Sequence, residues 1–484
     1  MKRKVTEYVL YRGRYFIGYS LALALVVGVF VLAALFLPDG LRAEERATAI
    51  ASGSISFTEF HPDLVVNLPY LLLQRASFVV FGASTLTIKL PSIILGVITI
   101  IGLFLLLRQW FHRNVALIAG IIATTIPAMI FVAQDGTPVA LMLTLSIWLL
   151  LSAIHVTRQH KPAGLWKTLA IILLALNLYV PLGIYLNLAV LTTMIFHPHI
   201  RLVMRRMKVH VTVIGAVLGL ALIAPLAYAI IMNPSIAETL LGMPESFDSP
   251  IKALLSFAGL LFGSYGSAAQ PVAPALLSLG ILAIVIIGAY RFIKVKHTAR
   301  SYIIWFWSLT LIPLVYLNQQ YINYLLPLVI LMIATGIGAL IHEWYSMFPL
   351  NPYARVVGLV PLTFIVVGLM VSGLTRYEVA YNYTPSIAAQ FNNDTKLVEQ
   401  AIAAADQVGD KKVTVVVNES ELPFYELVAE YGGNFTPTSS LDAPTPIIVS
   451  GDYEKRSSIK STPIRIITNR FSENADRFYL YASL

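Results

Sequence analysis

The 484-residue chain is 57% hydrophobic and 12% charged, and its mean hydropathy is +0.75. Soluble domains carry about 25% charged residues, so this composition excludes an ordinary soluble protein and favours a polytopic membrane protein. The net charge is +9, yet the basic residues lie mainly in short loops between apolar runs, which argues against a nucleic-acid partner. The absence of cysteine excludes disulfide and thiolate chemistry.

The chain begins with a basic segment and continues into an apolar run from Tyr15 to Leu37. This run contains no charge, is too long for a signal-peptide core, and is not followed by a small-residue cleavage site. It predicts a retained first transmembrane helix.

The first long loop, residues 38–85, carries nine ionisable side chains of both signs, whereas almost everything else before residue 375 is uncharged helix or short basic loop. Such groups are expensive near a membrane and are kept where they are used. The segment 41–52 contains good helix formers, with Glu residues near its start. After Pro62 an apolar stretch predicts a helix lying on the membrane surface, although Pro69 leaves its continuity open. The loop's ionisable residues are Asp39, Arg42, Glu44, Glu45, Arg46, Glu59, His61, Asp63 and Arg75.

Further uncharged runs have the length needed to span a bilayer. One of them, Thr168–Phe196, is either one tilted helix or two helices broken at Pro181. The remaining runs are Leu90–Leu107, Val115–Ala133, Pro138–Ile154, Val211–Met232, Pro271–Tyr290, Ser301–Leu317, Tyr321–Ile341 and Val356–Thr375.

The distribution of positive charge decides between these alternatives. With two helices in the ambiguous run, the basic segments 1–14, 108–113, 158–167, 201–208 and 291–300 and Arg355 all face one side. With one helix, the cluster at 201–208 falls on the wrong side. The pattern therefore predicts about eleven spans, a cytoplasmic N-terminus and an exocytoplasmic C-terminus. The loop 38–85 is then exocytoplasmic, as are the short turn 134–137 and the loop 233–270.

The composition changes near Arg376 to that of a soluble domain. Alternating and short apolar runs predict strands at 411–418, 445–450, 463–469 and 477–484, and a helix at 421–432. The chain is thus predicted to consist of a transmembrane domain, residues 1–375, and a small exocytoplasmic α/β domain, residues 376–484.

Several short motifs resemble the GT-C fold of integral-membrane glycosyltransferases, in particular glycosyltransferase family 39 with its protein O-mannosyltransferases and aminoarabinose transferases. The segment 81–84 reads Phe-Gly-Ala-Ser, and 89–92 reads Lys-Leu-Pro-Ser, with Lys89 in place of the usual Arg. Arg108 follows at the expected place. The segment 61–64 resembles the family's His-Pro-Pro-Leu, and 324–327 resembles its Tyr-Leu-Leu-Pro. The resemblance covers roughly residues 15–375.

The resemblance implies transfer of a sugar from a polyprenyl-phosphate carrier to an exocytoplasmic lipid, glycan or protein acceptor. An acid in the first outer loop, normally the Asp of an Asp-Glu pair, is then the base. This chain reads Ala43-Glu44-Glu45-Arg46. In one register Glu44 takes the catalytic position, and in the other Ala43 does, which would leave the site without its acid. A second family acid in the span after the turn 134–137 is also absent, with Asp135 shifted into the turn.

Phosphate departure needs cations, and an acceptor hydroxyl needs a carboxylate to take its proton. Glu44 and Glu45 point about 100° apart on a helix, so one of them can face a given cleft. Glu44 is the first candidate base and Glu45 the second. Asp135 is the third candidate catalytic residue and could bind the acceptor or a metal, although Asp-Gly is also a common turn pair.

Six further residues are candidate partners of the substrate or its phosphate. Arg75 and the others could equally anchor the chain in the headgroup region. The six are Arg42, Arg46, Arg75, Lys89, Tyr324 and Arg376.

Glu59, His61 and Asp63 form a spaced set of metal-binding types, which raises a divalent cation as a possible cofactor. Their spacing is no recognised metal signature, and a polar loop entering a helix at Pro62 explains them equally well.

Two other functions fit the same composition. A lipid or sugar transporter would place polar or broken helices near the membrane midplane, and Asn177 and Asn187 around Pro181 are its best support. A non-catalytic homologue would bind the lipid carrier without turning it over. In every case membrane lipids are partners, and the protein is predicted to be a multi-pass protein of the cell membrane.

Overall fold

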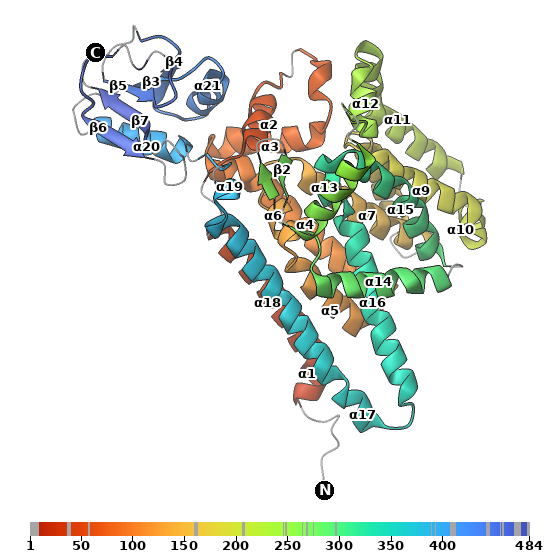
Figure 1. The fold of residues 1–484 in the computed structure, drawn as a ribbon. Coiled ribbons are helices and arrows are strands. Elements are labelled where there is room, and N and C mark those ends of the chain that lie inside the picture. The colour runs from red at the N-terminus through yellow and green to blue at the C-terminus, as the bar shows by residue number, and fades with distance from the viewer. Residues whose placement is uncertain are drawn as a thin grey trace. The chain divides into compact units, whose positions relative to one another are not determined.

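The computed structural model describes residues 9–35, 40–56, 59–158, 163–205, 209–244, 246, 249–263, 265–267, 270–273, 275–295, 298–388, 390–392, 394–406, 413–441, 446–454, 456, 459–468 and 476–481. The chain divides into two compact units (Figure 1). Unit 1 comprises Met1–Phe36, Leu95–Gln134 and Val139–Ala380. Unit 2 comprises Leu37–Ile94, Asp135–Pro138 and Tyr381–Leu484. The predicted boundary at residue 375 stays a prediction.

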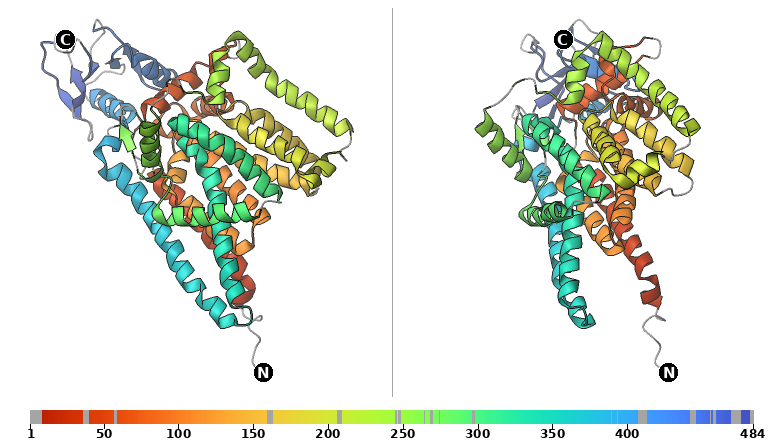
Figure 2. Two further views of the ribbon diagram at one scale, coloured as in Figure 1. Left: turned by 45° about the vertical axis from the view of Figure 1, so that its right-hand side comes forward. Right: turned by 90° about the vertical axis from the view of Figure 1, so that its right-hand side faces the viewer.

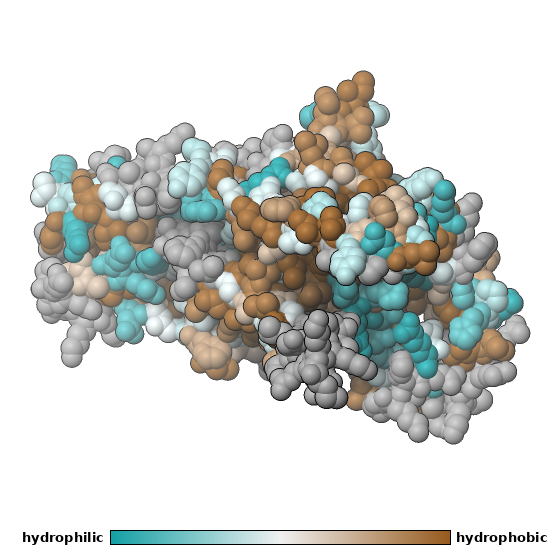
Figure 3. All heavy atoms as spheres, turned by 90° about the horizontal axis from the view of Figure 1, so that it is seen from below, coloured by the Kyte–Doolittle hydropathy of each residue, from teal (hydrophilic) through white to brown (hydrophobic). Residues whose placement is uncertain are grey.

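Unit 1 is built from apolar helices. Among the described residues, six helices are long and apolar enough to cross a membrane, and further apolar helices are shorter. Many large apolar side chains of unit 1 are exposed, for example Ile231, Leu309 and Phe364, as lipid-facing side chains require. On the face shown in Figure 3, brown, hydrophobic residues lie among teal, hydrophilic ones. The polytopic helical fold is therefore confirmed, whereas the count of eleven spans stays a prediction. The helices are α1 (Val9–Leu35), the part of α4 (Thr85–Trp110) from Leu95 onward, α5 (Arg113–Thr124), α6 (Pro127–Val132), α7 (Val139–Thr157), α8 (Ala163–Asn177), α9 (Gly183–Phe196), α10 (Pro198–Arg205), α11 (Val209–Met232), α12 (Ser235–Leu241), α13 (Pro250–Phe262), α14 (Leu279–Lys294), α15 (Ala299–Leu317), η3 (Gln319–Leu325), α16 (Leu326–Met347), α17 (Pro352–Val357) and most of α18 (Leu359–Tyr383).

The ambiguous run at 168–196 forms two helices, α8 and α9, as the charge distribution predicts. The Asn177 side chain donates to the carbonyl of Gly183 at 2.8 Å and to the side-chain oxygen of Asn187 at 3.0 Å. Asn187 donates in turn to the carbonyl of Leu174 at 2.8 Å. The two amides therefore satisfy backbone groups exposed by the break, which accounts for them without a transport role.

Two of the predicted spans begin or break differently in the structure. The run 271–290 opens with strand β2 (Gln270–Ala273), which pairs antiparallel with β1 (Tyr265–Ser267), and α14 starts only at Leu279. The run 115–133 is divided into α5 and α6, because Pro127 lacks the amide hydrogen that a continuous helix would need.

Helix α14 crosses α16 at a steep angle, as both views of Figure 2 show. The crossing is close because Gly288 and Gly336 face the partner backbone. A Cβ atom at Gly288 would lie 2.1 Å from the carbonyl oxygen of Met332, and one at Gly336 would lie 2.2 Å from that of Ile284. Small residues at a crossing let membrane helices pack backbone to backbone.

Unit 2 contains the helices of the first outer loop: α2 (Ala43–Gly53), η2 (Pro62–Leu64), α3 (Leu68–Phe81) and the start of α4 (Thr85–Trp110). Pro69 does not interrupt α3, because it occupies the first turn, where its missing amide hydrogen has no partner to lose. Both predicted loop helices are therefore present. Residues 38 and 39 lie outside the described part of the chain.

The C-terminal part of unit 2 is a five-stranded sheet in the order β4-β3-β5-β7-β6. Strands β3, β4 and β5 are parallel, and β7 pairs antiparallel with β5 and β6. The predicted strands and the helix α21 are present; the pattern missed β4 and α20. The elements are α19 (Pro385–Ala388), α20 (Asp394–Asp406), β3 (Val413–Val416), α21 (Leu422–Glu430), β4 (Phe435–Thr438), β5 (Ile447–Ser450), β6 (Arg465–Thr468) and β7 (Asp476–Tyr481).

One hydrophobic core joins the outer-loop helices to this sheet. Leu41, Ala49, Phe78 and Ile88 are buried together with side chains of α20, α21 and β3, among them Phe424. Burying a Phe or Leu stabilises a fold by about 1.5–3 kcal/mol. Two backbone hydrogen bonds between Leu41 and Asn392 add to the contact. The C-terminal segment thus supports the start of α2, where the candidate acids lie.

Candidate active site

Five of the sequence-predicted residues come together in unit 2: Arg42, Glu44, Glu45, Lys89 and Asp135. We call them the carboxylate cluster. Arg42, Glu44 and Glu45 lie at the start of α2, Lys89 lies near the start of α4, and Asp135 precedes α7. Residues up to 93 positions apart in the chain are therefore held together at the start of α2, the part of the outer loop where the sequence predicts the chemistry.

Glu45 is fully buried, with an exposed fraction of 0%. One carboxylate oxygen accepts from the backbone amide of Arg42 at 2.7 Å, and the other accepts from that of Gly136 at 2.6 Å. The Lys89 ammonium lies 3.7 Å from the latter oxygen. Burial raises the pKa of Glu45, and the Lys89 charge works against that rise. Glu45 is the third residue of α2, and it caps the helix by accepting from the amide of Arg42, the residue just before the helix. The three-residue spacing between Arg42 and Glu45 is a signal that sequence reasoning can use.

Arg42 is buried between two carboxylates. One of its guanidinium nitrogens contacts Glu44, and the other donates to Asp135 at 2.6 Å. Burial alone would lower the pKa of Arg42, but the carboxylates of Asp135, Glu44 and Glu45 raise it above its ordinary value. The guanidinium therefore stays charged and holds the two acids in fixed positions.

The three acids differ in their access to solvent. The Glu44 side chain is 53% exposed, whereas that of Asp135 is 3% exposed and that of Glu45 is 0% exposed. Asp135 also accepts a hydrogen bond from the Thr137 hydroxyl on the oxygen that does not face Arg42. Both oxygens of Asp135 and both of Glu45 are thus engaged by the protein. Glu44 is the acid that an external hydroxyl can reach.

Gln74 supports the cluster and is a residue that sequence reasoning missed. It is fully buried, and its amide donates to the carbonyl of Ile88 at 2.8 Å and to that of Gly136 at 3.4 Å. Its oxygen accepts from the Ser52 hydroxyl at 2.6 Å. Gln74 thereby ties α2, α3, α4 and the turn before α7 together. A single amide within an apolar helix is the signal that could have identified it.

The other predicted phosphate partners of unit 2 already bind protein groups. Arg46 lies 4.0 Å from Asp394 and 3.8 Å from Glu421, both in the C-terminal part of the unit. Arg75 donates to the carbonyl of Gly53 at 3.1 Å. Their binding to a substrate phosphate stays a prediction, and a phosphate would have to share or displace these partners.

Tyr324 and Arg376 lie in unit 1. Tyr324 is buried, and its ring centre lies 5.1 Å from that of Tyr321. Arg376 donates to the carbonyls of Leu277 and Phe262 at 3.1 and 2.5 Å. Both residues therefore have a packing or bonding role of their own, and their proposed contact with substrate stays a prediction.

The predicted metal-binding set is on the surface. The Glu59 and His61 side chains are 78% and 50% exposed, and their closest polar atoms lie 4.0 Å apart. Within the described residues, no group of three His, Cys, Asp or Glu side chains converges to hold a metal ion. Metal binding by Glu59, His61 and Asp63 therefore stays a prediction.

Unit 2 also contains a buried ionic network that the sequence analysis did not predict. Arg477 donates to both carboxylate oxygens of Asp394 at 2.7 Å and to Glu421 at 2.8 Å. The Tyr425 hydroxyl donates to Asp394 at 2.7 Å. Since Arg46 of α2 approaches the same two acids, this network links the C-terminal sheet to the helix that carries Glu44.

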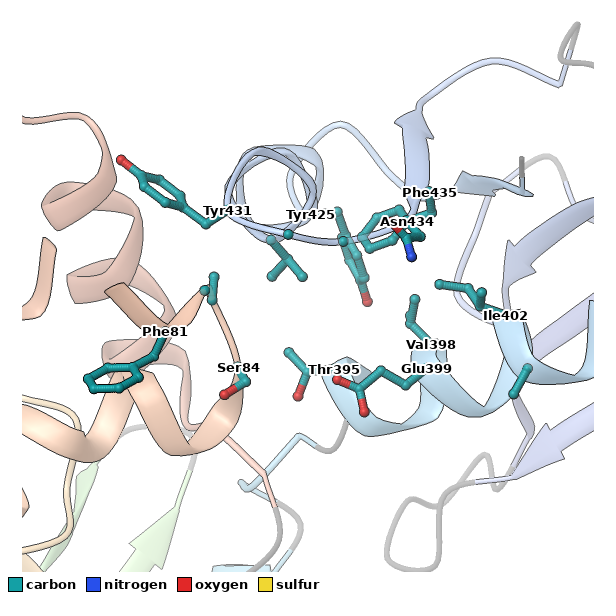
Figure 4. Close-up of a pocket in the computed structure, with 16 residues that line it drawn as sticks. Phe81, Ser84, Thr395, Val398, Glu399, Ile402, Tyr425, Tyr431, Asn434 and Phe435 are labelled. Atoms are coloured by element: carbon teal, nitrogen blue, oxygen red, sulfur yellow. The ribbon is translucent and has the colours of Figure 1, made fainter. Parts of the chain in front are cut away.

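A cavity of about 460 Å³ lies beside this network, between the turn 81–84 and the C-terminal part of unit 2. Helix α20 contributes Thr395 and Glu399 on one side, and Tyr425 and Asn434 lie on the other (Figure 4). The hydroxyl groups of Thr395 and Thr85 are hydrogen-bonded to each other at 2.6 Å. The motif at 81–84 lines this cavity, whereas none of the candidate catalytic, phosphate-binding or metal-binding residues belongs to the lining.

Comparison with known proteins agrees with the fold. Residues 67–228 match the model of the dolichyl-phosphate-mannose-protein mannosyltransferase family. No curated protein sequence matches the chain significantly.

Several solved structures are similar to this chain, among them the following two. ArnT from Cupriavidus metallidurans bound to undecaprenyl phosphate is 13% identical, with a TM-score of 0.57 over 96% of this chain and 97% of that one. The Archaeoglobus fulgidus oligosaccharyltransferase tethered with an acceptor peptide is 12% identical, with a TM-score of 0.53 over 88% of this chain and 64% of that one. The family match and these two likenesses show that this chain has the GT-C fold of integral-membrane glycosyltransferases.

Proposed function

We propose that the protein is a membrane glycosyltransferase that moves a sugar from a polyprenyl-phosphate carrier to an exocytoplasmic acceptor. The observation that carries the proposal is the carboxylate cluster within a GT-C fold. It offers one accessible carboxylate, Glu44, oriented by a buried guanidinium, Arg42. Proton abstraction from an acceptor hydroxyl needs a carboxylate that is accessible and oriented in this way.

In the proposed reaction Glu44 takes the proton of the acceptor hydroxyl. The acceptor oxygen forms a bond to the anomeric carbon of the sugar as the bond from that carbon to the phosphate oxygen breaks. The polyprenyl phosphate leaves with the electron pair of the broken bond. Arg42 contacts the proposed base directly, and its role in this scheme is to hold the Glu44 carboxylate in the orientation needed for proton transfer. Glu45 and Asp135 hold Arg42 and the neighbouring backbone in place and are positioning residues in this scheme.

The proposed partners follow from the same chemistry. One similar structure, ArnT, contains undecaprenyl phosphate, and another, the archaeal oligosaccharyltransferase AglB, contains a dolichol-phosphate with an inhibitory peptide. We propose a lipid-linked sugar donor of that class for this chain, with a lipid, glycan or protein as acceptor. A divalent-metal requirement stays a prediction, and titration of the transfer assay with a chelator tests it.

A second function has one specific observation in its favour. The four predicted outer cations Arg42, Arg46, Arg75 and Lys89 all contact protein groups. A protein that only holds the lipid carrier, without turning it over, would not need a cation free for the leaving phosphate. The turnover experiment separates the two functions.

The test is incubation of the purified full-length protein with a panel of radiolabelled polyprenyl-phosphate sugars and membrane extracts as acceptors. Release of free polyprenyl phosphate together with labelled acceptor supports the glycosyltransferase. Saturable donor binding without release, for every sugar in the panel, contradicts it and supports the carrier-binding alternative.

The orientation of the chain is a separate prediction. Because the protein has no cysteine, single-cysteine variants report accessibility cleanly. Ser54→Cys in the outer loop and Ser440→Cys in the C-terminal part are expected to react with a membrane-impermeant maleimide in intact cells. Asn114→Cys, directly after the basic segment 108–113, is expected to react only after the membrane is opened. Labelling of Asn114→Cys in intact cells would overturn the predicted topology.

A further inference from the structure

Unit 1 contains a groove of about 440 Å³ that the proposed reaction does not use. Apolar side chains of α7, α8, α9 and α15 form most of its wall, for example Leu149, Leu174 and Ile303. Three cationic residues line it as well: Arg158, Lys167 and Arg300. The described lining contains no Asp or Glu. An apolar wall beside three positive charges suits an amphiphile with an anionic head group.

The groove gathers segments that the charge distribution assigns to the same side of the membrane. Trp110 belongs to the segment 108–113, Arg158 and Lys167 bound the segment 158–167, and Arg300 ends the segment 291–300. None of these segments contains Asp or Glu. The structure thus brings three basic segments around one opening, where they face the anionic leaflet in the predicted topology.

The two arginines are fixed by the end of α4. Arg158 donates to the Gln109 side chain at 2.7 Å and to its carbonyl at 2.9 Å. Arg300 donates to the carbonyl of Trp110 at 2.9 Å, and its guanidinium lies 4.6 Å from the ring centre of Phe111. These contacts set the guanidinium groups in place at the groove before any ligand arrives, which lowers the entropic cost of binding.

Cationic donors remain for a ligand. The Nε atom of Arg300 is buried and has no hydrogen-bond partner among the described residues. The Lys167 ammonium, at the groove, likewise has no protein partner in the described part of the chain. An anionic oxygen supplied from outside can reach the Lys167 ammonium, whereas the enclosed Nε atom of Arg300 contributes only its positive charge to the groove.

We propose that this groove binds an anionic phospholipid of the surrounding membrane. Its phosphate lies at Lys167, Arg158 and Arg300, and an acyl chain lies along the apolar wall. A phospholipid fits better than a free phosphate because the wall is apolar, and the bilayer presents anionic phospholipid at high local concentration. Basic pockets between membrane helices on the cytoplasmic side bind lipid headgroups of this class. The proposal does not depend on the transfer reaction.

The test uses the purified full-length protein in detergent, titrated with phosphatidylglycerol or phosphatidylcholine and followed by native mass spectrometry. We expect saturable binding of phosphatidylglycerol and at least tenfold weaker binding of phosphatidylcholine. Lys167→Gln should weaken phosphatidylglycerol binding about five- to tenfold, since one charge near an anionic headgroup is lost. Lys167 has no described protein partner, so this variant should fold normally.

Two further variants make the result specific to the groove. Lys294 belongs to the segment 291–300 but does not line the groove. Lys294→Gln removes the same charge as Lys167→Gln, and this variant should bind phosphatidylglycerol like the wild type. Ala170→Phe fills the wall without changing the charge and should also reduce binding. Equal binding of the two lipids, or equal losses for Lys167→Gln and Lys294→Gln, would overturn the proposal. Displacement by inorganic phosphate would assign the cations to a free anion, and displacement by stoichiometric undecaprenyl phosphate would assign the groove to the carrier; either result would contradict a phospholipid.

Discussion

Glu44→Gln is expected to reduce sugar transfer by about 10²–10⁴-fold while leaving donor binding and folding intact. The amide keeps the size of the side chain and can still accept a hydrogen bond from Arg42, but it cannot take a proton at neutral pH. Because Glu44 is 53% exposed, the substitution leaves no buried group without a partner. The measurement is transfer rate under saturating donor, beside a donor-binding titration.

Glu430→Gln is the matched control, because it neutralises an exposed acid of the same unit at the end of α21. Its rate should equal that of the wild type. Glu45→Gln should behave differently from both: Glu45 is buried against Lys89 and two backbone amides, so its main effect should be a lower melting temperature. Full transfer activity in Glu44→Gln would remove Glu44 as the base. A rate loss confined to Glu45→Gln, at unchanged stability, would move the role of base to Glu45.

Arg477→Met should destabilise unit 2 by about 3–5 kcal/mol, because removing one partner leaves a buried charge uncompensated. Asp394 is almost fully buried and receives two of the hydrogen bonds that Arg477 donates. Burial by itself would lower the pKa of Arg477, and Asp394 raises it above its ordinary value. The guanidinium is thus charged and committed to this network. The measurement is the melting temperature of the purified full-length protein.

Arg465→Met provides the control, since Arg465 is an exposed arginine on the neighbouring strand β6. It should change the melting temperature little. Arg477→Lys should fall in between, because a lysine keeps the charge but cannot donate to both oxygens of Asp394 at once. If Arg477→Met melts like the wild type, the network does not support unit 2, and the link from the sheet to α2 through Arg46 loses its basis.

The membrane fold could be predicted from the sequence because apolar runs and basic loops are formed by contiguous residues. A helix in lipid must satisfy its own backbone, so the length and hydropathy of a run are sufficient to predict it. The break between α8 and α9 followed from the charge distribution for the same reason. The predicted helix boundaries were wrong where a proline divided a run, as at Pro127, and where a strand replaced the start of a helix, as at Gln270–Ala273.

The candidate site was only partly predictable. Sequence reasoning selected the residues of the cluster by type and by the expected side of the membrane, and it placed Glu44 before Glu45 without any measure of how accessible each carboxylate is. Their ranking depends on which carboxylate is buried and which oxygens are already bonded. Those facts arise from contacts between α2, α4 and the turn before α7, which are distant in the chain.

The sequence by itself determined that this protein is a multi-helix membrane protein with a GT-C resemblance and an acidic first outer loop, because hydropathy, charge placement and short motifs are properties of contiguous residues. Only the tertiary structure decided that Glu45 and Asp135 are enclosed while Glu44 is accessible, and that Arg46 contacts acids from the C-terminal sheet. It also decided that Gln74 ties four segments together. The physical reason is that burial and ion pairing depend on chain segments that meet only after folding, and no local pattern encodes which of them meet.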